Sequence, residues 1–386
     1  HNGSSDAEIR EMLGVIGVKD MEELVSKTIP ANIRSTKPLA LKEGLTESEL
    51  LKRLKSIASE NKLYKSYIGM GYTGTIVPTV ILRNILESPA WYTQTMVIDI
   101  TGMEISNASL LDEGTAAAEA MIMSFHAGQK KRPTFFVDKR CYPQTIACLE
   151  TRAECLGINI VVGDVLKHDF EPHGKDLCGV LVQYPATDGS IHDYSSLATK
   201  IHSLGGQVVC ATDLLALTML TPPGEWGADI AVGNSQRFGV PLGYGGPHAA
   251  FFACKDDHKR KVPGRLIGVS RDSSGNKAYR LSLQTREQHI RREKATSNIC
   301  TAQALLANMA AMYGVYHGPE GVKAIANRVH NLTKILAAEI KHLGHRVITE
   351  HFFDTLNIHV GNSEHIYKKA LNANINLRKV DETTIG

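Results

Sequence analysis

The chain changes character near residue 95, where short continuous apolar runs begin to alternate with amphipathic stretches. The runs predict strands at 95–100, 133–138, 158–162, 178–183, 207–211, 229–233 and 249–253, with helices at 114–127, 143–156 and 193–204. Continuous apolar strands are typical of a sheet that is covered on both faces. The pattern therefore predicts an α/β fold around a mostly parallel seven-stranded sheet. Its last two strands are joined by a turn too short for a helix, which favours antiparallel pairing.

Both flanks of this region have helical patterns. The first, 6–60, includes a capping box at Thr46 and Glu49, and the helical pattern resumes at 77–86 after a break. The second predicts long helices at 301–316 and 319–344, then strands at 345–348 and 355–359 and a helix at 363–373. We therefore expect a helical N-terminal arm over 1–94 and a large α/β domain over 95–300. Over 301–386 we expect long helices and a truncated small α+β domain, because both ends of the chain look trimmed.

Bulk composition narrows the class of protein only slightly. The 386 residues are 43% hydrophobic and 22% charged, with 43 Lys and Arg against 40 Asp and Glu. This is ordinary for a soluble globular chain of two domains, and a net charge of +3 is too small to indicate nucleic acid as a partner. Basic runs at 255–261 and 286–294 allow two interpretations, solvated helix faces or a docking surface for an acidic partner.

Cysteine usage and hydropathy bear on the compartment. The seven cysteines show no C-x-x-C spacing and several lie in apolar runs. They are therefore expected to be free thiols in a reducing compartment, and not disulfides or metal ligands. No run of 18 apolar residues occurs, so no membrane span is expected, and no signal or transit segment is visible.

The most informative chemistry lies at 229–248, a short apolar strand followed by a polar pair and a glycine-rich turn. An enzyme of the aminotransferase-like fold that uses pyridoxal phosphate (PLP) carries its Schiff-base lysine just after such a strand. Here that place is held by Gln236, whose amide cannot form an imine. The pattern therefore predicts the fold of a PLP enzyme without covalent attachment of the cofactor.

Two further positions could contact a cofactor but also allow a plainer interpretation. Glu113, Gly114 and Thr115 open a helix, where free N–H groups favour an anion. The acids at 112 and 113 would repel a phosphate, which favours a helix start capped by its own side chains. Asp213 follows the end of a strand, where a pyridine nitrogen could be paired, and it equally suits a cap for the next helix.

Four longer segments carry a resemblance to one known family. They are YIGMGY at 67–72, LLDEGTAAAE at 110–119, SQRFGVPLGYGGPH at 235–248 and REQHIRREKATSNICT at 286–301. Through them the chain resembles the P-protein of the glycine cleavage system, a glycine decarboxylase, over essentially its whole length. The match is to the N-terminal half. In that family two homologous aminotransferase-like halves are fused or carried on two subunits, and the C-terminal half holds the PLP lysine.

Carried over residue by residue, the resemblance implies that several cofactor contacts are absent together. The His-Lys pair of the catalytic half falls on Ser235-Gln236, and the Ser-Gly of its phosphate turn falls on Glu113-Gly114. The histidine that stacks on the pyridine ring falls near Cys141. The aspartate that pairs the pyridinium falls near residues 210 and 211, with Asp213 displaced along the chain. PLP is therefore expected in the partner half and not covalently on this chain.

The chain departs from the family pattern in two places. The family has a polar, Tyr-rich connection between the segment matching 91–94 and the strand expected to begin at Thr95, and this connection is missing here. Thr73 stands where the family has a second tyrosine after Tyr72, which puts any contact made by that ring in doubt.

The activity that the resemblance implies is PLP-dependent decarboxylation of glycine, with transfer of the aminomethyl group to the lipoyl arm of H-protein. This half is expected to be inactive alone, to pack against the catalytic half and to complete one wall of its cleft. Candidate lining residues, each of which also suits ordinary structure, are Tyr67, Gly69, Met70, Tyr72, Ser297 and Asn298. An acidic lipoyl carrier would suit the basic face at 286–294. The family implies the mitochondrial matrix, or the cytoplasm if the chain is bacterial.

Two other functions stay open from the sequence. The chain could be a free-standing, catalytically inactive scaffold or regulatory pseudoenzyme of the same fold, and the absence of a lysine-containing half encoded with it would indicate this. It could also be a PLP enzyme that uses another lysine. Against this, Lys139 follows the wrong strand and Lys255 lies past the last one.

Overall fold

The computed structural model describes residues 3–35, 37, 40–41, 44–86, 95–107, 109–246, 248–264, 266–283, 288–295, 299 and 302–386. The chain forms two compact units, 1–63 and 64–386. The three-part division expected from the sequence stays a prediction.

The smaller unit consists of the helices α1 (Asp6–Ile16), α2 (Met21–Thr28) and α3 (Glu47–Ala58). Capping boxes begin two of them, at Ser5 with Glu8 and at Thr46 with Glu49, the second as the sequence predicts. Of the residues in these three helices, all of which the structure describes, only Leu13 is buried. This unit therefore has amphipathic helices but almost no core of its own.

The larger unit is built on a seven-stranded sheet in the order β2-β8-β7-β6-β5-β3-β4. The strands β7, β6, β5, β3 and β4 pair in parallel, whereas β8 runs antiparallel to both β7 and β2. The strands are β2 (Ile105–Ser106), β3 (Thr134–Asp138), β4 (Asn159–Gly163), β5 (Leu177–Tyr184), β6 (Gln207–Thr212), β7 (Ile230–Asn234) and β8 (Ala250–Cys254). The predicted α/β class, the mostly parallel sheet and the antiparallel final pair are confirmed.

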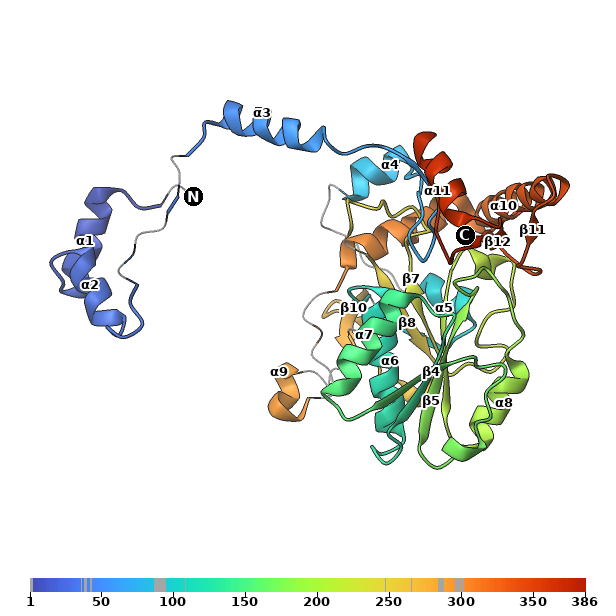
Figure 1. Cartoon of the computed structure of the whole chain (residues 1–386). Helices are drawn as coiled ribbons and strands as arrows, with labels where there is room; N and C mark the ends of the chain where they lie inside the picture. Colours follow the sequence, from blue (N-terminus) through green and yellow to red (C-terminus); the bar gives the residue numbers. More distant parts are fainter. Residues whose placement is uncertain are drawn as a thin grey trace. The chain divides into compact units, whose positions relative to one another are not determined.

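Helices cover both faces of this sheet (Figure 1). On one face α6 (Glu113–Ala127) and α7 (Pro143–Glu154) pack on Val137, Leu181 and their neighbours, while on the other α8 (Ser195–Ser203) packs on Val180 and Val208. Successive strand residues point to opposite faces, so each strand contributes to both layers of the core. This explains why the strands are apolar throughout.

One predicted strand is wrong. Residues 95–100 belong to a helix, α5 (Thr95–Thr101). The run of β-branched residues favours a strand locally, but Val97 and Ile100, three residues apart, both pack against the core beside α8. The Thr101 hydroxyl also donates to the Val97 carbonyl at 2.6 Å, as it does within a helical turn. Tertiary packing thus overrides local propensity here, and β2 supplies the seventh strand.

The remaining elements lie around this sheet or follow it. Before it come β1 (Lys65–Ser66), α4 (Thr79–Ile81) and a π-helical turn, η1 (Leu82–Leu86). Short helical turns are η2 (Glu171–His173), η3 (Ala216–Thr218), η4 (Asp256–His258), η5 (Arg292–Lys294) and α9 (Gln288–Arg291). The strands β9 (Leu266–Arg271) and β10 (Lys277–Ser282) form an antiparallel hairpin.

The C-terminal region begins with the long helix α10 (Ala304–His342), which covers both predicted helices. It is interrupted at Gly318, where φ is 65° and ψ is 173°, just before Pro319. Then follow β11 (Arg346–Val347), β12 (Ile358–His359), α11 (Ser363–Asn372), β13 (Ile375–Asn376) and β14 (Thr384–Ile385). β11, β12 and β14 form one small sheet, and β13 pairs with β1.

Candidate functional site

The predicted site residues gather where the parallel strands end at their carboxyl termini. β5 ends near Gln183 and β6 is followed by Asp213, while Asn234 closes β7. Glu113 begins α6 beside them, since its carboxylate contacts both Gln183 and Asn234. In open α/β sheets this edge is the usual place for a ligand, and a ligand site at this edge stays a prediction.

Gln236 lies two residues beyond β7 and is 1% exposed. Its Oε1 accepts from the Thr73 N–H at 3.0 Å and from the Thr73 hydroxyl at 3.4 Å. Its Nε2 donates to the Thr73 carbonyl at 2.6 Å. The side chain at the expected lysine position is therefore fully engaged with the backbone of a segment 163 residues earlier in the chain.

Carboxylates of the chain itself occupy the start of α6. Asp112 is the N-cap, and its Oδ1 accepts from the Thr115 N–H at 2.7 Å. The next residue, Glu113, is buried and accepts from Asn234 Nδ2 at 2.9 Å and from Gln183 Nε2 at 3.5 Å. Burial raises the pKa of Glu113 to about 7, with smaller opposing effects of the two amides. The capped-helix interpretation of 113–115 thus describes the geometry.

A buried ion triad holds the position expected to pair a pyridinium. Arg237 lies 3.5 Å from Asp213 and 2.6 Å from Asp354, and all three side chains are less than one-fifth exposed. Burial alone would lower the pKa of Arg237, but the two carboxylates raise it above its usual value. Asp213 also accepts from the Leu215 N–H at 2.8 Å, so it caps the following turn, the plainer of its two expected roles.

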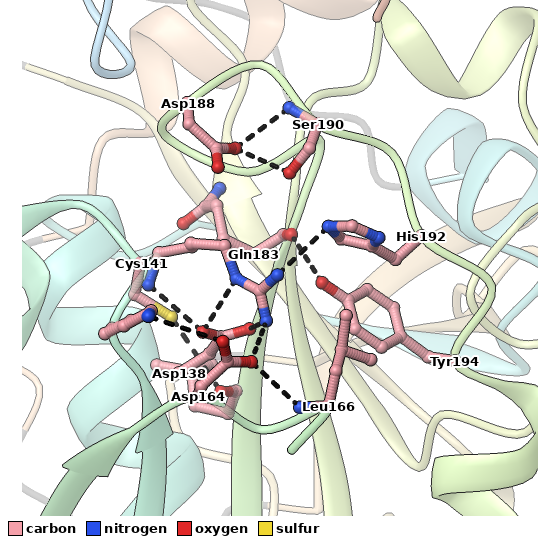
Figure 2. A network of polar contacts seen from close by, with 12 residues as sticks. Asp138, Cys141, Asp164, Leu166, Gln183, Asp188, Ser190, His192 and Tyr194 are labelled. Atoms are coloured by element: carbon pink, nitrogen blue, oxygen red, sulfur yellow. Dashed lines mark hydrogen bonds and ion pairs between the residues drawn. The ribbon is translucent and has the colours of Figure 1, made fainter. Parts of the chain in front are cut away.

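Cys141 lies next to a polar network that the sequence did not reveal (Figure 2). Arg140 donates to Asp138 at 3.0 Å and to Asp164 at 2.9 Å, and it lies 3.1 Å from Nε2 of His192. Because a guanidinium can only donate, this His192 nitrogen must accept, which places the imidazole proton on Nδ1. Burial and then Arg140 lower the pKa of His192.

This network fixes the carboxyl ends of β3 and β4, because Asp138 ends the first strand and Asp164 follows the second. Burial raises the pKa of the Cys141 thiol well above its usual value, so that the thiol stays protonated. A signal for the network existed in the sequence, since charged residues follow two neighbouring apolar runs. Only the sheet order shows that these runs are adjacent.

Four of the six expected lining residues lie on one segment beside this site. Tyr67 and Tyr72 are 58% and 46% exposed, and Gly69, Met70 and Gly71 have φ of 70°, 57° and 84°. Tyr72 meets His248 edge-on at 4.8 Å between ring centroids. Ser297 and Asn298 lie outside the described residues, as do Arg286 and the connection between residues 94 and 95.

A cavity of about 840 Å³ lies elsewhere in the larger unit. Residues that line it include Tyr184, His192, Trp226, His330 and Phe352. None of the residues singled out from the sequence lines this cavity. It touches the Arg140 network through His192, and Tyr184, the last residue of β5, also lines it.

Neither alternative lysine is placed like a cofactor lysine. Lys255 Nζ lies 2.9 Å from Asp229, just before β7 and therefore at the opposite edge of the sheet from Gln236. Lys139 is 57% exposed and lies 3.3 Å from Asp164. Across the described ranges no three His, Cys, Asp or Glu side chains are grouped to hold a metal ion. The helices in those ranges also fall short of the length and apolar character that crossing a membrane requires.

The sheet order, its helical layers and the site at its carboxyl edge define the fold of the PLP-dependent fold type I enzymes. Oryza sativa TDC with PLP and tryptamine shares this fold with a TM-score of 0.62 at 7% identity, over 100% of this chain and 93% of that one. A crystal structure of glycine decarboxylase (P-protein) of the glycine cleavage system, in inhibitor-bound form, is much closer. Its TM-score is 0.88 at 30% identity, over 100% of this chain and 94% of that one.

The family model for the glycine cleavage system P-protein matches residues 1–94 and 93–386. The chain therefore belongs to the glycine cleavage system P-protein family. It is 53% identical over 408 residues to the glycine dehydrogenase (decarboxylating) of Nostoc punctiforme, covering 100% of this chain and 41% of that protein. It is 52% identical over 407 residues to the mitochondrial enzyme of Mus musculus, covering 39% of it. The chain matches the N-terminal part of such relatives and spans about two-fifths of their length.

Proposed function

We propose that this chain is the half of a glycine decarboxylase that supports the reaction without holding its cofactor. The whole enzyme would decarboxylate glycine with PLP and pass the aminomethyl group to the lipoyl arm of H-protein. The observation that carries the proposal is the presence of Gln236, with its bonds to Thr73, in place of a lysine. Gln236 stands at the expected lysine position, and both ends of its amide are bonded to Thr73.

The residues present do not fit PLP. The helix N-terminus that would receive a phosphate holds Asp112 and the buried Glu113. The carboxylate that would pair a pyridinium already faces Arg237. A phosphate at this helix start would be repelled by the Asp112 carboxylate, and a second cation near Asp213 would compete with a bonded guanidinium. We infer that the PLP of the complete enzyme is held by the lysine-containing C-terminal half or subunit.

The lengths of the relatives support such a partner. The curated relatives are more than twice as long as the aligned segment, since it covers only 41% of the Nostoc protein. The solved glycine decarboxylase chain is covered to 94%, so a chain of that protein can have about this length. The proposal therefore suits both a fused and a separate C-terminal half. We propose the mitochondrial matrix, or the cytoplasm of a bacterium, as the compartment, because relatives of both origins match equally well.

Within this enzyme we propose that the segment around Tyr67 and Tyr72 lines the cleft of the catalytic half, together with Ser297 and Asn298. Its exposed aromatic rings and left-handed backbone distinguish it from the buried strands nearby. Large, stiff aromatic side chains lose little entropy when a partner covers them, so they are common anchors at interfaces. H-protein is the proposed acceptor, and the basic residues near Arg291 are the proposed contact for an acidic carrier.

The test is to measure visible absorbance of bound PLP and release of carbon dioxide from glycine. Three samples are compared: this chain, the lysine-containing half, and the two mixed with lipoylated H-protein. We expect no bound PLP on this chain alone and full decarboxylation only in the mixture. Stoichiometric PLP on this chain alone would overturn the proposal. No activity in the mixture, with the partner half folded and loaded with PLP, would instead favour an inactive scaffold.

A further inference from the structure

We propose that Gln236 is a positioning residue, which fixes the shape of the segment 64–76 and so presents Tyr67 and Tyr72 to the catalytic half. This inference rests on the proposed function. It assigns a task to the position where a PLP enzyme has its lysine. We call the segment 64–76 the arch, because it is held at both ends and is exposed in the middle.

The first end of the arch is held by the C-terminal region. β1 pairs in parallel with β13, with Lys65 opposite Ile375 and Ser66 opposite Asn376. The Tyr67 N–H also donates to the Asn376 carbonyl at 2.8 Å. The pairing therefore reaches the first exposed tyrosine and stops there.

The second end is held by the turn after β7. Gln236 bonds both the N–H and the carbonyl of Thr73, so it fixes the two peptide planes on either side of that residue. Two residues later, the Thr75 hydroxyl donates to the Val240 carbonyl at 2.8 Å. The peptide that Gln236 fixes first is the one that joins Tyr72 to Thr73, so the backbone of Tyr72 is positioned directly.

The middle of the arch is a tight bend, across which the Tyr72 N–H donates to the Gly69 carbonyl at 3.2 Å. Gly69, Met70 and Gly71 all have positive φ, and for Met70 this region is sparsely populated. A contact from the large domain supports this bend, since Gln144 Nε2 donates to the Met70 carbonyl at 2.9 Å. Positive φ at Met70 carries a backbone cost, so the tether at Thr73 adds to the bend's own hydrogen bond in holding this shape.

The tether requires a side chain that both donates and accepts. A lysine at 236 could donate to the Thr73 carbonyl but could not accept from its N–H, and a leucine could do neither. Because Gln236 is 1% exposed, water has little access to replace a lost bond. Glutamine therefore supplies both the acceptor and the donor that Thr73 uses at this position, which a lysine could not.

The arch leaves the rings of Tyr67 and Tyr72 exposed, and the Tyr72 hydroxyl stays protonated. Burial, and then the charges of Asp112 and Glu113, raise the pKa of Tyr72 above its usual value. The Tyr72 ring is held against His248 but remains 46% exposed. It can therefore act as a fixed hydrogen-bond donor on the surface that the catalytic half would cover.

The experiment uses the full-length enzyme and follows hydrogen exchange in the peptide 67–76 by mass spectrometry. Gln236→Leu should speed exchange of this peptide by about tenfold or more, because the Thr73 N–H loses its acceptor. Gln207→Leu is the matched control. Its amide contacts His258 near the start of β6, at the opposite edge of the sheet, and exchange at 67–76 should stay unchanged.

The Gln236→Glu variant distinguishes hydrogen bonding to Thr73 from simple packing of the side chain at position 236. A protonated carboxyl can donate and accept, whereas a carboxylate can only accept. A carboxylate at 236 still accepts from the Thr73 N–H but repels the Thr73 carbonyl, so protection of 67–76 in this variant should approach that of the wild type at low pH and weaken as the pH is raised. The wild-type and Gln207→Leu proteins should show no such dependence. A general structural defect would not produce this dependence.

The kinetic part compares kcat/KM for glycine, with H-protein present, in the same variants. We expect about a tenfold loss in Gln236→Leu, and recovery of Gln236→Glu at low pH relative to Gln207→Leu. Unchanged exchange at 67–76 would overturn the tether, and faster exchange with unchanged kinetics would overturn its role in positioning. If the wild-type enzyme itself failed to decarboxylate glycine, the proposed function would fail while the exchange result would still stand.

Discussion

At the residue scale, the carboxyl edge of the sheet is occupied by charges that the chain pairs within itself. Arg237 faces Asp213 and Asp354, and Glu113 is held by two amides. Removing one member of a buried ion cluster leaves the others without compensation, which costs more than the intact cluster contributes. These residues should therefore determine stability more than they determine chemistry.

Arg237→Met should lower the free energy of unfolding by about 3 kcal/mol, because Asp213 and Asp354 would stay buried without a cation. Urea denaturation of the isolated chain measures this change. Arg328→Met, at an exposed position of α10, is the control and should change the free energy by less than about 0.5 kcal/mol. Equal changes in the free energy of unfolding for the two substitutions would show that the ion triad does not stabilise the folded chain.

The titration of Glu113 should make the free energy of unfolding depend on pH. Its pKa is raised to about 7 in the folded chain from a usual value of 4.5, so the folded state retains a proton that the unfolded state has lost. Its contribution to stability is therefore complete below the unfolded pKa and is lost as the pH rises through the folded pKa. For a shift of this size the loss is roughly 3 kcal/mol.

Glu113→Gln removes this titration. Urea denaturation at about pH 5 and about pH 8 should show the variant gaining roughly 2–3 kcal/mol relative to the wild type over that interval. Glu154→Gln, at an exposed position near the end of α7, is the matched control and should follow the wild type. Parallel profiles for all three proteins would show that Glu113 is ionised in the folded chain throughout.

The sequence located several of these residues but not their partners. Gln236, Glu113 and Asp213 were predicted because each stands at the end of a strand or the start of a helix. The Thr73 contact of Gln236 joins residues 163 positions apart, and no local pattern encodes such a distance. The same is true of Asp354, which comes from the C-terminal region to meet Arg237.

At the element scale, the strands were predicted best where burial on both faces makes a continuous apolar run. Strands β3 to β8 all fall within a residue or so of the expected bounds. The strand predicted at 95–100 is wrong because its β-branched run favours a strand only locally. The helix α5 is stabilised by packing of Val97 and Ile100 against the core. The two-residue β2 is too short to leave a pattern, and pairing with β8 defines it.

The start of α6 gives a prediction at this scale. Asp112→Ala should lower the free energy of unfolding by about 1 kcal/mol, because the Thr115 N–H loses its capping acceptor. Asp112→Asn keeps that acceptor and should cost less than about 0.5 kcal/mol. Since the Asp112 charge contributes to the raised pKa of Glu113, the Asn variant should also lower that pKa. Thermal and pH-dependent unfolding of the three proteins checks both expectations.

At the scale of the whole molecule, the two units differ in how they bury apolar surface. The larger unit has continuous clusters on both faces of its sheet. In the smaller unit, Leu50, Leu51, Leu54 and Ile57 share one face of α3 and are all more than half exposed. A helix of this kind gains most of its stability from what covers it, and not from its own propensity.

Hydrogen exchange of the isolated chain should therefore be graded. Amides of α3 should exchange about a hundredfold or more faster than those of β5 and β6, because α3 opens locally without disturbing a core. Mass spectrometry of peptides over 47–58 and 177–184 measures this ratio. Similar protection of the two peptides in the isolated chain would show that the apolar face of α3 is already covered.

The neighbouring residues Gln236 and Arg237 have a consequence for evolution. One tethers Thr73, and the other holds Asp213 and Asp354. A single substitution that placed a lysine at 236 would leave the Thr73 N–H without its acceptor, while Glu113 and Arg237 would keep their present partners. A first step that placed a lysine at 236 would thus cost this bond before any later step could help. Under the proposed function, a lineage that carries this chain would have to cross a fitness valley to acquire a cofactor lysine.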